Sequence, residues 1–513
     1  MKKEKKTLTQ TEWIGLILGI AVIFGMFVRF LPGGMAGFPL NDGGMFLSMI
    51  RDLESSGYTL PEFTSYNDLN IPFAYPPFGF YFARLLSDLL AIPELTLLRW
   101  LPPLVNSFSI LAFYLLASEF MKSKSLGALA AAFYALTPGA FGWFVMGGGL
   151  TRSFGSFFLL LTVYSVLGLY KNGGKKFAAL IMLFGALTVL SHPEAGVHAA
   201  ASCLLVWIFF GRAVRSFFQS VIVAVGVLLL SSPWWATVIS HHGLEPFLSA
   251  MQTGSHGTPL LTALGSLITV EGIIPISTAL RVIGLAWGAW KRRYFLLAWA
   301  FLPFLVEPRS APSVSHYPMT LLAALAFAEA FPALVARLRK TTIDLEALYS
   351  SRGYNAALFA AFFLLFIDSG LYGFRLVGNS LRLQDREAMT WVDKYAAGDA
   401  VFLVWTGIKS PEIDPYVEWF PALANRRNLT TLQGYEWLLS DGFYDQYGEL
   451  ARLQQCASVD CIELWAERMN WRYDYVAVFE GQNTDLDDLF AGELGYFEVY
   501  SRETVTIFGR ATP

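Results

Sequence analysis

A single carboxylate, Asp42, stands beside an amide and two glycines in the segment Asn41-Asp42-Gly43-Gly44, just after the first hydrophobic stretch. The glycines let the backbone turn tightly and leave room for a ligand to approach it. The carboxylate can cap the helix expected after it, which is a common use of Asn-Asp-Gly. It can also act as a general base or as a metal ligand at the edge of a membrane. The residues alone leave both interpretations open.

Two arginines are candidate ligands for a phosphate, because a guanidinium group is planar, permanently charged and matched to phosphate oxygens. Arg152 follows three glycines at the start of a hydrophobic segment, where the amides of a helix N-terminus would add to anion binding. Arg309 lies in a later polar connection between two hydrophobic segments. The alternative is that each arginine extends its charge to lipid headgroups from the membrane interface.

Histidine and glutamate supply further polar groups where hydrophobic segments are interrupted. His192-Pro193-Glu194 is either a polar hinge or a set of ligands for the substrate, a metal or an acceptor, and His316 follows the polar connection that holds Arg309. Ionisable groups are costly at membrane depth, so their gathering on one side of the membrane indicates a site. On the topology derived below, all six histidines lie on that side: His192, His198, His241, His242, His256 and His316.

The motifs for several other chemistries are missing from the sequence. No spacing of histidine, cysteine or acidic residues matches a zinc signature. A divalent cation therefore stays an open expectation, with Asp42 and Glu194 as its candidate ligands. The sequence also lacks a phosphate-cradling Gly-Lys-Ser/Thr loop, a dinucleotide fingerprint and a serine nucleophile elbow. These absences argue against a machine driven by ATP.

The composition identifies the elements that must position these residues. Of the 513 residues, 55% are hydrophobic and only 15% are charged, which excludes an ordinary soluble domain. Repeated apolar runs match the length needed to cross a bilayer. We therefore predict a polytopic α-helical membrane protein with about eleven spans. They are 13–31, 97–120, 126–146, 152–170, 177–191, 196–210, 217–238, 262–290, 294–306, 317–336 and 355–377.

The basic residues orient these spans through the positive-inside rule. We interpret Met1–Lys6 as a cytoplasmic tail before a retained anchor, and every basic cluster of the later connections then falls on the same side. An odd number of spans places the C-terminal part outside, in an integral protein of the plasma (cytoplasmic) membrane. Residues 78–90 must lie on the outer surface for this pattern to hold, because counting them as a span would reverse all later clusters.

The first outer loop, about residues 32–96, is unusually long, and long loops in compact proteins are often functional. It holds two amphipathic segments, 44–56 and 78–90, which we expect to be surface helices on the bilayer. Tyr75-Pro76-Pro77 fixes an extended entry into the second one. The loop therefore presents Asp42 at the membrane surface.

Charge divides the chain into two domains. Residues 1–378 have a net charge of +8 and residues 379–513 a net charge of −11. The acidic part alternates expected helices with the strands 400–405 and 475–479 and ends in a hairpin, so we predict an extracytoplasmic α/β domain. Its Cys456 and Cys461 can form a disulfide in an oxidising compartment, since a metal site needs more ligands. The basic residues form no single face, so we expect no nucleic-acid partner.

Two aromatic stretches of this C-terminal domain, 418–421 and 433–437, could stack on sugars. We favour the alternative that they form the core of the domain.

The order of these features resembles the GT-C superfamily of membrane glycosyltransferases, and most closely its protein O-mannosyltransferase and aminoarabinose-transferase branch. Three short segments carry the resemblance, which covers residues 10–240 well and the later spans loosely. They are Asn41-Asp42-Gly43, Tyr75-Pro76-Pro77-Phe78-Gly79-Phe80-Tyr81 and Leu98-Arg99-Trp100-Leu101-Pro102.

The resemblance implies an inverting transfer of sugar from a polyprenyl-phosphate-linked donor to a lipid, glycan or protein acceptor at the outer membrane face. Asp42 would be the general base, while Arg152, Arg309 and His192 would hold the donor phosphate, with Glu194 and His316 as further substrate ligands. Many members have two adjacent acids where this chain has Asn41 and Asp42, which puts metal dependence in doubt.

The alternative functions are a multi-span transporter and a non-catalytic protein that binds or assembles lipid-linked sugars. A transporter is expected to show inverted repeats and polar groups at mid-membrane depth, and this sequence shows neither.

Overall fold

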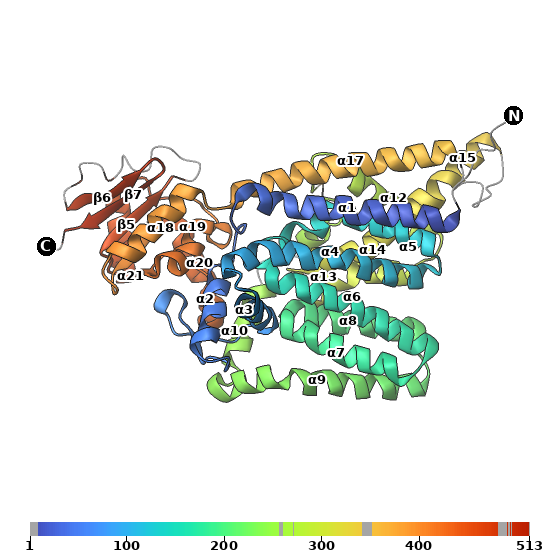
Figure 1. Cartoon of the computed structure of the whole chain (residues 1–513), viewed down its shortest axis with the longest axis horizontal. Coiled ribbons are helices and arrows are strands. Elements are labelled where there is room, and N and C mark those ends of the chain that lie inside the picture. The colour runs from blue at the N-terminus through green and yellow to red at the C-terminus, as the bar shows by residue number, and fades with distance from the viewer. Residues whose placement is uncertain are drawn as a thin grey trace.

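Long helices run side by side and form a bundle that carries a smaller α/β domain at one end (Figure 1). This computed structural model describes residues 9–255, 260–269, 271–340, 351–480, 490, 493 and 495–511. We call the end of the bundle that meets the α/β domain the domain end. Helix α1 begins at the opposite end, so the described start of the chain and the C-terminal domain are separated by the length of the bundle (Figure 1).

Within the described residues, seven helices are long and apolar enough to cross a membrane, or eight when one bent pair is counted. The first five are α1 (Gln10–Ala36), α4 (Glu94–Met121), α6 (Gly149–Asn172), α8 (Pro193–Phe210) and α9 (Val214–His242). The other two combine α14 (Ala311–Leu325) with α15 (Phe331–Arg339), and α17 (Arg352–Leu376) with α18 (Leu383–Tyr395). The shorter α7 (Lys175–Ser191) and α13 (Tyr294–Val306) complete the bundle. The chain is thus a mostly helical integral membrane protein, while the number of eleven spans stays a prediction.

Two of the expected spans are interrupted. The segment 126–146 forms α5 (Lys124–Ala135), after which the chain bends by 91° through η2 (Pro138–Ala140) and η3 (Gly142–Phe144). The segment 262–290 is divided between α11 (Leu260–Gly265) and α12 (Ile276–Trp290). Proline and glycine occur at both breaks, and neither residue favours a continuous series of helical hydrogen bonds. Hydropathy alone did not reveal these breaks. The first exposes the N–H of Gly139, which a polar cluster described below uses, and the second exposes those of Ile273 and Ile274, which Asp368 of α17 accepts at 2.6 and 2.8 Å.

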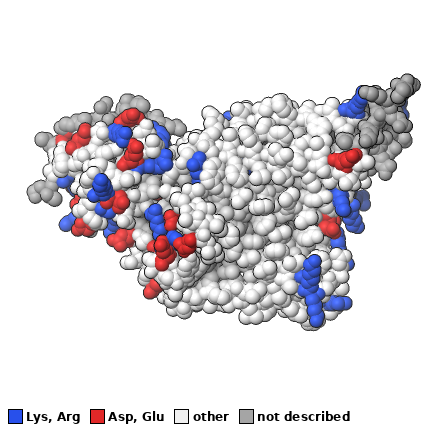
Figure 2. Space-filling view, in the orientation of Figure 1, with Lys and Arg blue, Asp and Glu red and all other residues white. Residues whose placement is uncertain are grey.

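On the face shown in Figure 2, the charged side chains gather towards the two ends of the molecule. The middle of the visible face is almost free of charge, as expected for a surface that faces lipid. Lys and Arg predominate at the end opposite the C-terminal domain, and acidic and basic residues mix at the domain end.

The segment between α1 and α4 fills the junction between the bundle and the C-terminal domain. It contains α2 (Gly44–Ser55), β1 (Phe63–Thr64), η1 (Tyr66–Asp68), β2 (Ile71–Pro72) and α3 (Phe78–Leu90). Both expected amphipathic helices are present. However, α2 is buried along most of its length, because α3 and α4 cover one side and α19 (Pro415–Ala424) of the C-terminal domain covers another. Arg84 of α3 ties the segment together through ion pairs with Glu54 and Glu94, both within 2.8 Å.

The C-terminal domain is built on a five-stranded mixed sheet with the strand order β4-β3-β5-β7-β6. The strands are β3 (Val401–Trp405), β4 (Arg427–Asn428), β5 (Tyr475–Phe479), β6 (Tyr496–Arg502) and β7 (Val505–Arg510), which include both expected strands and the terminal hairpin. Its helices besides α18 are α19 (Pro415–Ala424), α20 (Phe443–Leu453) and α21 (Val459–Met469). A disulfide between Cys456 and Cys461 links α20 to α21, with the two sulfur atoms 2.07 Å apart.

Candidate active site

Asp42 forms an ion pair with Arg152 at the domain end of the bundle. Its Oδ2 atom lies 2.5 Å from Nη2 of Arg152, which belongs to the first turn of α6. Its Oδ1 atom accepts a hydrogen bond of 3.0 Å from the backbone N–H of Gly148. The side chains of Asp42 and Arg152 are 20% and 24% exposed, so both remain accessible to a ligand. Two donors from α6 and the turn before it thus orient one carboxylate at the surface of the bundle.

The glycines that precede Arg152 are required by the close approach of the Asp42 loop. A Cβ atom on Gly147 would lie 1.8 Å from the carbonyl oxygen of Asp42, and one on Gly148 would lie 2.2 Å from its Oδ2. Real Cβ atoms do not approach other atoms so closely, so a side chain at either position would push the loop away. The two segments are further joined by a hydrogen bond from the N–H of Gly147 to the carbonyl of Leu40, 2.9 Å long.

Arg152 has a second set of contacts that fixes its direction. Nη1 donates to the carbonyl of Trp143 over 2.9 Å, and the guanidinium carbon lies 5.6 Å from the centre of the Trp143 ring. The bend after α5 therefore holds Arg152 on one side, and Asp42 holds it on the other. We expected Arg152 to bind a phosphate. Its position next to Asp42 also allows it to orient the Asp42 carboxylate.

Glu418 of α19 reaches the same loop from the C-terminal domain. Its carboxylate accepts hydrogen bonds from the N–H groups of Gly43, Gly44 and Met45, at 3.2, 3.0 and 3.2 Å. Burial, and then the negative charge of Asp42, raises the pKa of Glu418 to about 8, although the three amide bonds oppose the rise. No sequence pattern pointed to this residue beyond its place in an aromatic stretch of the acidic domain.

The aromatic residues around Glu418 belong to the packed core, as we favoured. Trp419 is fully buried, and its indole N–H donates to the carbonyl of Asn41 over 2.7 Å. The Trp419 ring also packs edge-on against Phe38, with the ring centres 4.7 Å apart. Tyr66 donates a hydrogen bond of 2.5 Å from its hydroxyl to the carbonyl of Glu418. The Asp42 loop therefore lies between the bundle and the C-terminal domain.

His192, Glu194 and Arg309 lie near this pair. His192 caps the start of α8, since its Nδ1 accepts the N–H of Ala195 over 3.4 Å. The ring of Tyr75 lies 6.3 Å from the His192 ring, and its hydroxyl is 3.3 Å from Oγ1 of Thr151, the residue before Arg152. Tyr75 thus connects His192 to the first turn of α6.

Arg309 is exposed in the turn between α13 and α14. Glu307 stabilises this turn by accepting the N–H groups of Arg309 and Ser310 at 2.9 and 2.8 Å. Within the described residues, the Arg309 guanidinium forms no hydrogen bond or ion pair, although it lies close enough to act electrostatically on His192 and Glu194. An exposed positive charge is thus available to an anion on the side of His192 and Glu194, which Arg152 also faces.

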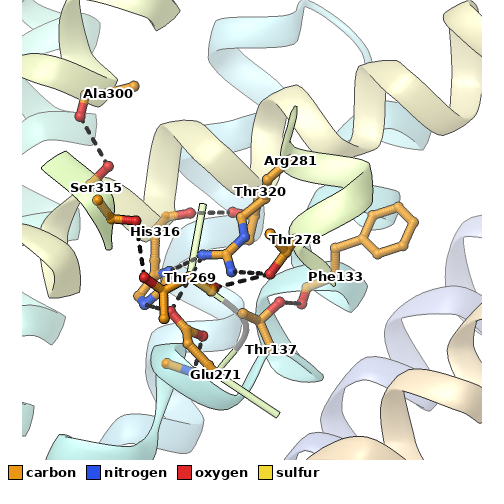
Figure 3. Close-up of polar contacts among 12 residues, drawn as sticks. Phe133, Thr137, Thr269, Glu271, Thr278, Arg281, Ala300, Ser315, His316 and Thr320 are labelled. Carbon is orange, nitrogen blue, oxygen red and sulfur yellow. Dashed lines mark hydrogen bonds and ion pairs between the residues drawn. The ribbon is translucent and has the colours of Figure 1, made fainter. Parts of the chain in front are cut away.

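His316 belongs to a separate buried cluster (Figure 3). Its Nε2 lies 3.3 Å from Oε1 of Glu271, and its Nδ1 lies 3.4 Å from Nη1 of Arg281. Glu271 also accepts the N–H of Gly139 over 2.8 Å, so the cluster joins the bend after α5 to α12 and α14. Among the described residues, no contact connects His316 with Asp42 or Arg152. The sequence reasoning missed both Glu271 and Arg281, which occupy a broken span and a helix interior.

The candidate metal ligands do not form a cluster in the part of the chain that the structure describes. No group of three or more histidine, cysteine, aspartate or glutamate residues converges there. The positive charge of Arg152 already lies against Oδ2 of Asp42, so a cation at this carboxylate would have to compete with the guanidinium. Of the other histidines, His242 contacts the carbonyl of Glu62 at 2.8 Å, and His256 lies outside the described residues.

No family model matches the sequence, and no curated protein matches it. Solved structures of three glycosyltransferases of the GT-C superfamily share its fold. ArnT from Cupriavidus metallidurans, solved bound to undecaprenyl phosphate, is 15% identical with a TM-score of 0.58, and the match covers 98% of this chain and 100% of that one.

The other two proteins are longer than this chain. The oligosaccharyltransferase AglB from Archaeoglobus fulgidus, solved with an inhibitory peptide and a dolichol-phosphate, is 14% identical with a TM-score of 0.52, covering 98% of this chain and 74% of that one. The arabinofuranosyltransferase AftD from Mycobacteria is 15% identical with a TM-score of 0.54, covering 99% of this chain and 40% of that one. These similarities confirm the expected fold.

Proposed function

Starting from the GT-C fold, we propose that this protein is a glycosyltransferase that moves a sugar from a polyprenyl-phosphate-linked donor to an acceptor hydroxyl. The observation that carries the proposal is the ion pair between Asp42 and Arg152 at the domain end, where Arg152 and the exposed Arg309 both act electrostatically on Glu194. A carboxylate next to positive charge is what the transfer requires, because a proton must leave the acceptor while a phosphate leaves the sugar.

In the proposed reaction, the acceptor oxygen attacks the anomeric carbon of the sugar directly. Asp42 accepts the proton of the acceptor hydroxyl as the new carbon–oxygen bond forms. The bond from the anomeric carbon to the phosphate oxygen breaks, and polyprenyl phosphate leaves with the bonding electron pair. A single displacement of this kind inverts the configuration at the anomeric carbon. Arg152 orients Asp42 through its short ion pair.

Arg309 is the proposed main ligand of the leaving phosphate. Its guanidinium is exposed and free of hydrogen bonds to the described residues, while Arg152 is already engaged by Asp42 and Trp143. Arg152 and His192 are proposed to contact the same phosphate from α6 and the start of α8, with Glu194 facing the sugar or the acceptor. The ArnT and AglB structures hold undecaprenyl phosphate and a dolichol-phosphate, which supports a lipid-linked donor here.

We also propose that the domain end faces the outside of the plasma (cytoplasmic) membrane. The basic residues gather at the opposite end (Figure 2), where the positive-inside rule expects the cytoplasm. The acceptor, whether a lipid, a glycan or a protein, would then approach from outside. Disulfide formation between Cys456 and Cys461 would suit such an oxidising compartment.

The proposal is tested by donor turnover in the purified protein. The protein is reconstituted in vesicles with a panel of radiolabelled polyprenyl-phosphate sugars and with extracted membranes as the source of acceptor. We expect release of polyprenyl phosphate and a fall of about 100-fold or more in Asp42→Asn. Asp393→Asn, which changes an exposed carboxylate of α18, serves as the matched control.

The alternative functions give different outcomes in the same vesicles. A transporter would move the labelled lipid or sugar across the bilayer without releasing polyprenyl phosphate. A binding protein would retain the donor and show no turnover in either form. Equal turnover by the wild type and by Asp42→Asn would remove Asp42 from the mechanism.

A further inference from the structure

Glu418 links the C-terminal domain to the loop that carries Asp42, although the two residues are 376 positions apart in the chain. We infer that Glu418 is a positioning residue for Asp42, so that the C-terminal domain completes the active site of the helical bundle. This inference rests on the proposed function of Asp42. It assigns to the C-terminal domain a role inside the site itself.

The amides that Glu418 binds are the free donors at the start of a helix. Helix α2 begins at Gly44, and the first N–H groups of any helix lack partners within it. The N-cap residue Gly43 has no side chain to supply one. One carboxylate from another domain therefore accepts the N–H groups of three consecutive residues, within 3.2 Å of each. Glu418 acts as the cap of α2.

This arrangement decides which of its two possible roles Asp42 takes. The sequence left Asp42 open as a helix cap or as a base, because Asn-Asp-Gly commonly starts a helix. With Glu418 in the capping position, both carboxylate oxygens of Asp42 turn away from α2 and bind Gly148 and Arg152 instead. The Glu418 carboxylate thus leaves Asp42 available for an acceptor.

The packing around Glu418 sets the position of the loop closely. A Cβ atom on Gly44 would lie 2.6 Å from the carbonyl oxygen of Glu418, and one on Gly43 would lie 2.9 Å from the Trp419 ring. The Trp419 indole holds the carbonyl of Asn41, and the Tyr66 hydroxyl holds the carbonyl of Glu418. A shift of α19 would therefore move the backbone on both sides of Asp42. A displacement of about 1 Å at a reacting group can cost about 100-fold in rate.

The test uses the full-length protein with Glu418→Gln at about pH 9, above the pKa of Glu418, where the substitution keeps the size of the side chain but replaces one acceptor oxygen of the carboxylate by an NH2 donor. Gly44→Ala is a second variant, because it pushes the loop from Glu418 without changing any charge. Glu449→Gln is the matched control. Glu449 is an acidic residue of the same domain that pairs only with Arg452 and Arg468 among the described residues.

Three quantities are measured for each variant: hydrogen exchange of the 43–45 amides, kcat and KM for the donor, and the melting temperature. We expect faster exchange at 43–45 and a fall in kcat of about 10- to 100-fold in both variants, with donor KM nearly unchanged. Glu449→Gln should behave as the wild type. Faster exchange with an unchanged kcat, or unchanged exchange in both variants, would overturn the inference.

The same experiment separates this inference from the proposed function. If Asp42→Asn abolishes turnover while Glu418→Gln and Gly44→Ala do not reduce it, the positioning role alone fails. If Asp42→Asn leaves turnover intact, the proposed function of the site fails whatever the Glu418 variants do.

Discussion

Asp42 and Arg152 are 110 residues apart in the sequence, yet Oδ2 of one lies 2.5 Å from Nη2 of the other. The pair joins the loop after α1 to the first turn of α6, where two glycines leave just enough room for the loop. A carboxylate held in this way has a fixed direction and remains partly exposed. The predictions below follow from this pair and from the groups packed around it.

Arg152→Lys should lower kcat although the positive charge is kept. A lysine has one ammonium group and cannot reach Asp42 and the carbonyl of Trp143 with a planar fork. We expect a loss of about 10- to 100-fold, because each charge-assisted hydrogen bond contributes about 1.5–3 kcal/mol. The measurement is donor turnover at saturating donor. A double-mutant cycle with Asp42→Asn should be non-additive, whereas additive losses would show that the two residues act independently.

Arg309→Gln should weaken donor binding more than it slows turnover. The unpartnered guanidinium is expected to bind the phosphate in the ground state, so its loss raises KM for the donor by about 10-fold or more. Arg292→Gln is the matched control, since Arg292 is an exposed arginine in the turn between α12 and α13. Equal KM values for the two variants would exclude Arg309 from the phosphate site.

Arg281→Gln should destabilise the bundle. The substitution removes the buried guanidinium of Arg281 that faces the partly buried Glu271 carboxylate, and the loss of one partner of an ion pair costs up to about 3 kcal/mol where the pair is buried. Unfolding by denaturant in detergent measures the effect.

His316→Gln gives the informative contrast. A loss of stability with unchanged donor KM would assign His316 to the structural cluster, whereas weaker donor binding at unchanged stability would support the substrate role expected from the sequence.

The stability of the protein should depend on pH through Glu418. Burial and the charge of Asp42 raise the pKa of Glu418 from 4.5 to about 8, so the folded protein holds this proton more tightly than the unfolded chain does. The contribution of Glu418 to the free energy of unfolding is fully present below about pH 4.5, and it is lost as the pH rises towards 8. The melting temperature of the wild type relative to Glu418→Gln should therefore fall between about pH 5 and about pH 9.

The groups that face Glu418 provide a control for that titration. They are Asp42 on the loop and Tyr66 on η1, and Asp42 carries the charge that opposes ionisation. Asp42→Asn should therefore reduce the pH-dependent difference. A difference in melting temperature that does not change with pH would contradict the raised pKa.

Removal of divalent cations should leave turnover unchanged. The Asp42 carboxylate is engaged by Arg152 and by the N–H of Gly148, a donor set that does not suit a cation. The measurement is donor release before and after treatment with a chelator, followed by addition of magnesium, manganese or zinc ions. Loss of activity that one of these ions restores would show that Arg152 moves aside and that the resting arrangement is not the active one.

The sequence by itself determined the class of the protein and the position of its polar groups along the chain. Hydropathy identified the long helices, short apolar runs identified two buried strands of the C-terminal domain, and the amphipathic pattern of 44–56 and 78–90 identified two further helices. These properties are local, because each depends on neighbouring residues in a helix or a strand. The order of Asp42, Tyr75 and the following spans was also enough to recognise the fold.

Only the tertiary structure decided which residues meet. It paired Arg152 with Asp42, left Arg309 exposed, and placed His316 with Glu271 and Arg281. It also brought Glu418 to the cap of α2, a role that its own sequence neighbourhood did not indicate. Distant carboxylates also accept the amides freed at the breaks in two expected spans: Glu271 accepts the N–H of Gly139, and Asp368 accepts those of Ile273 and Ile274. Most of these partners lie far apart in the sequence, so packing of the whole chain, and no local pattern, determines them.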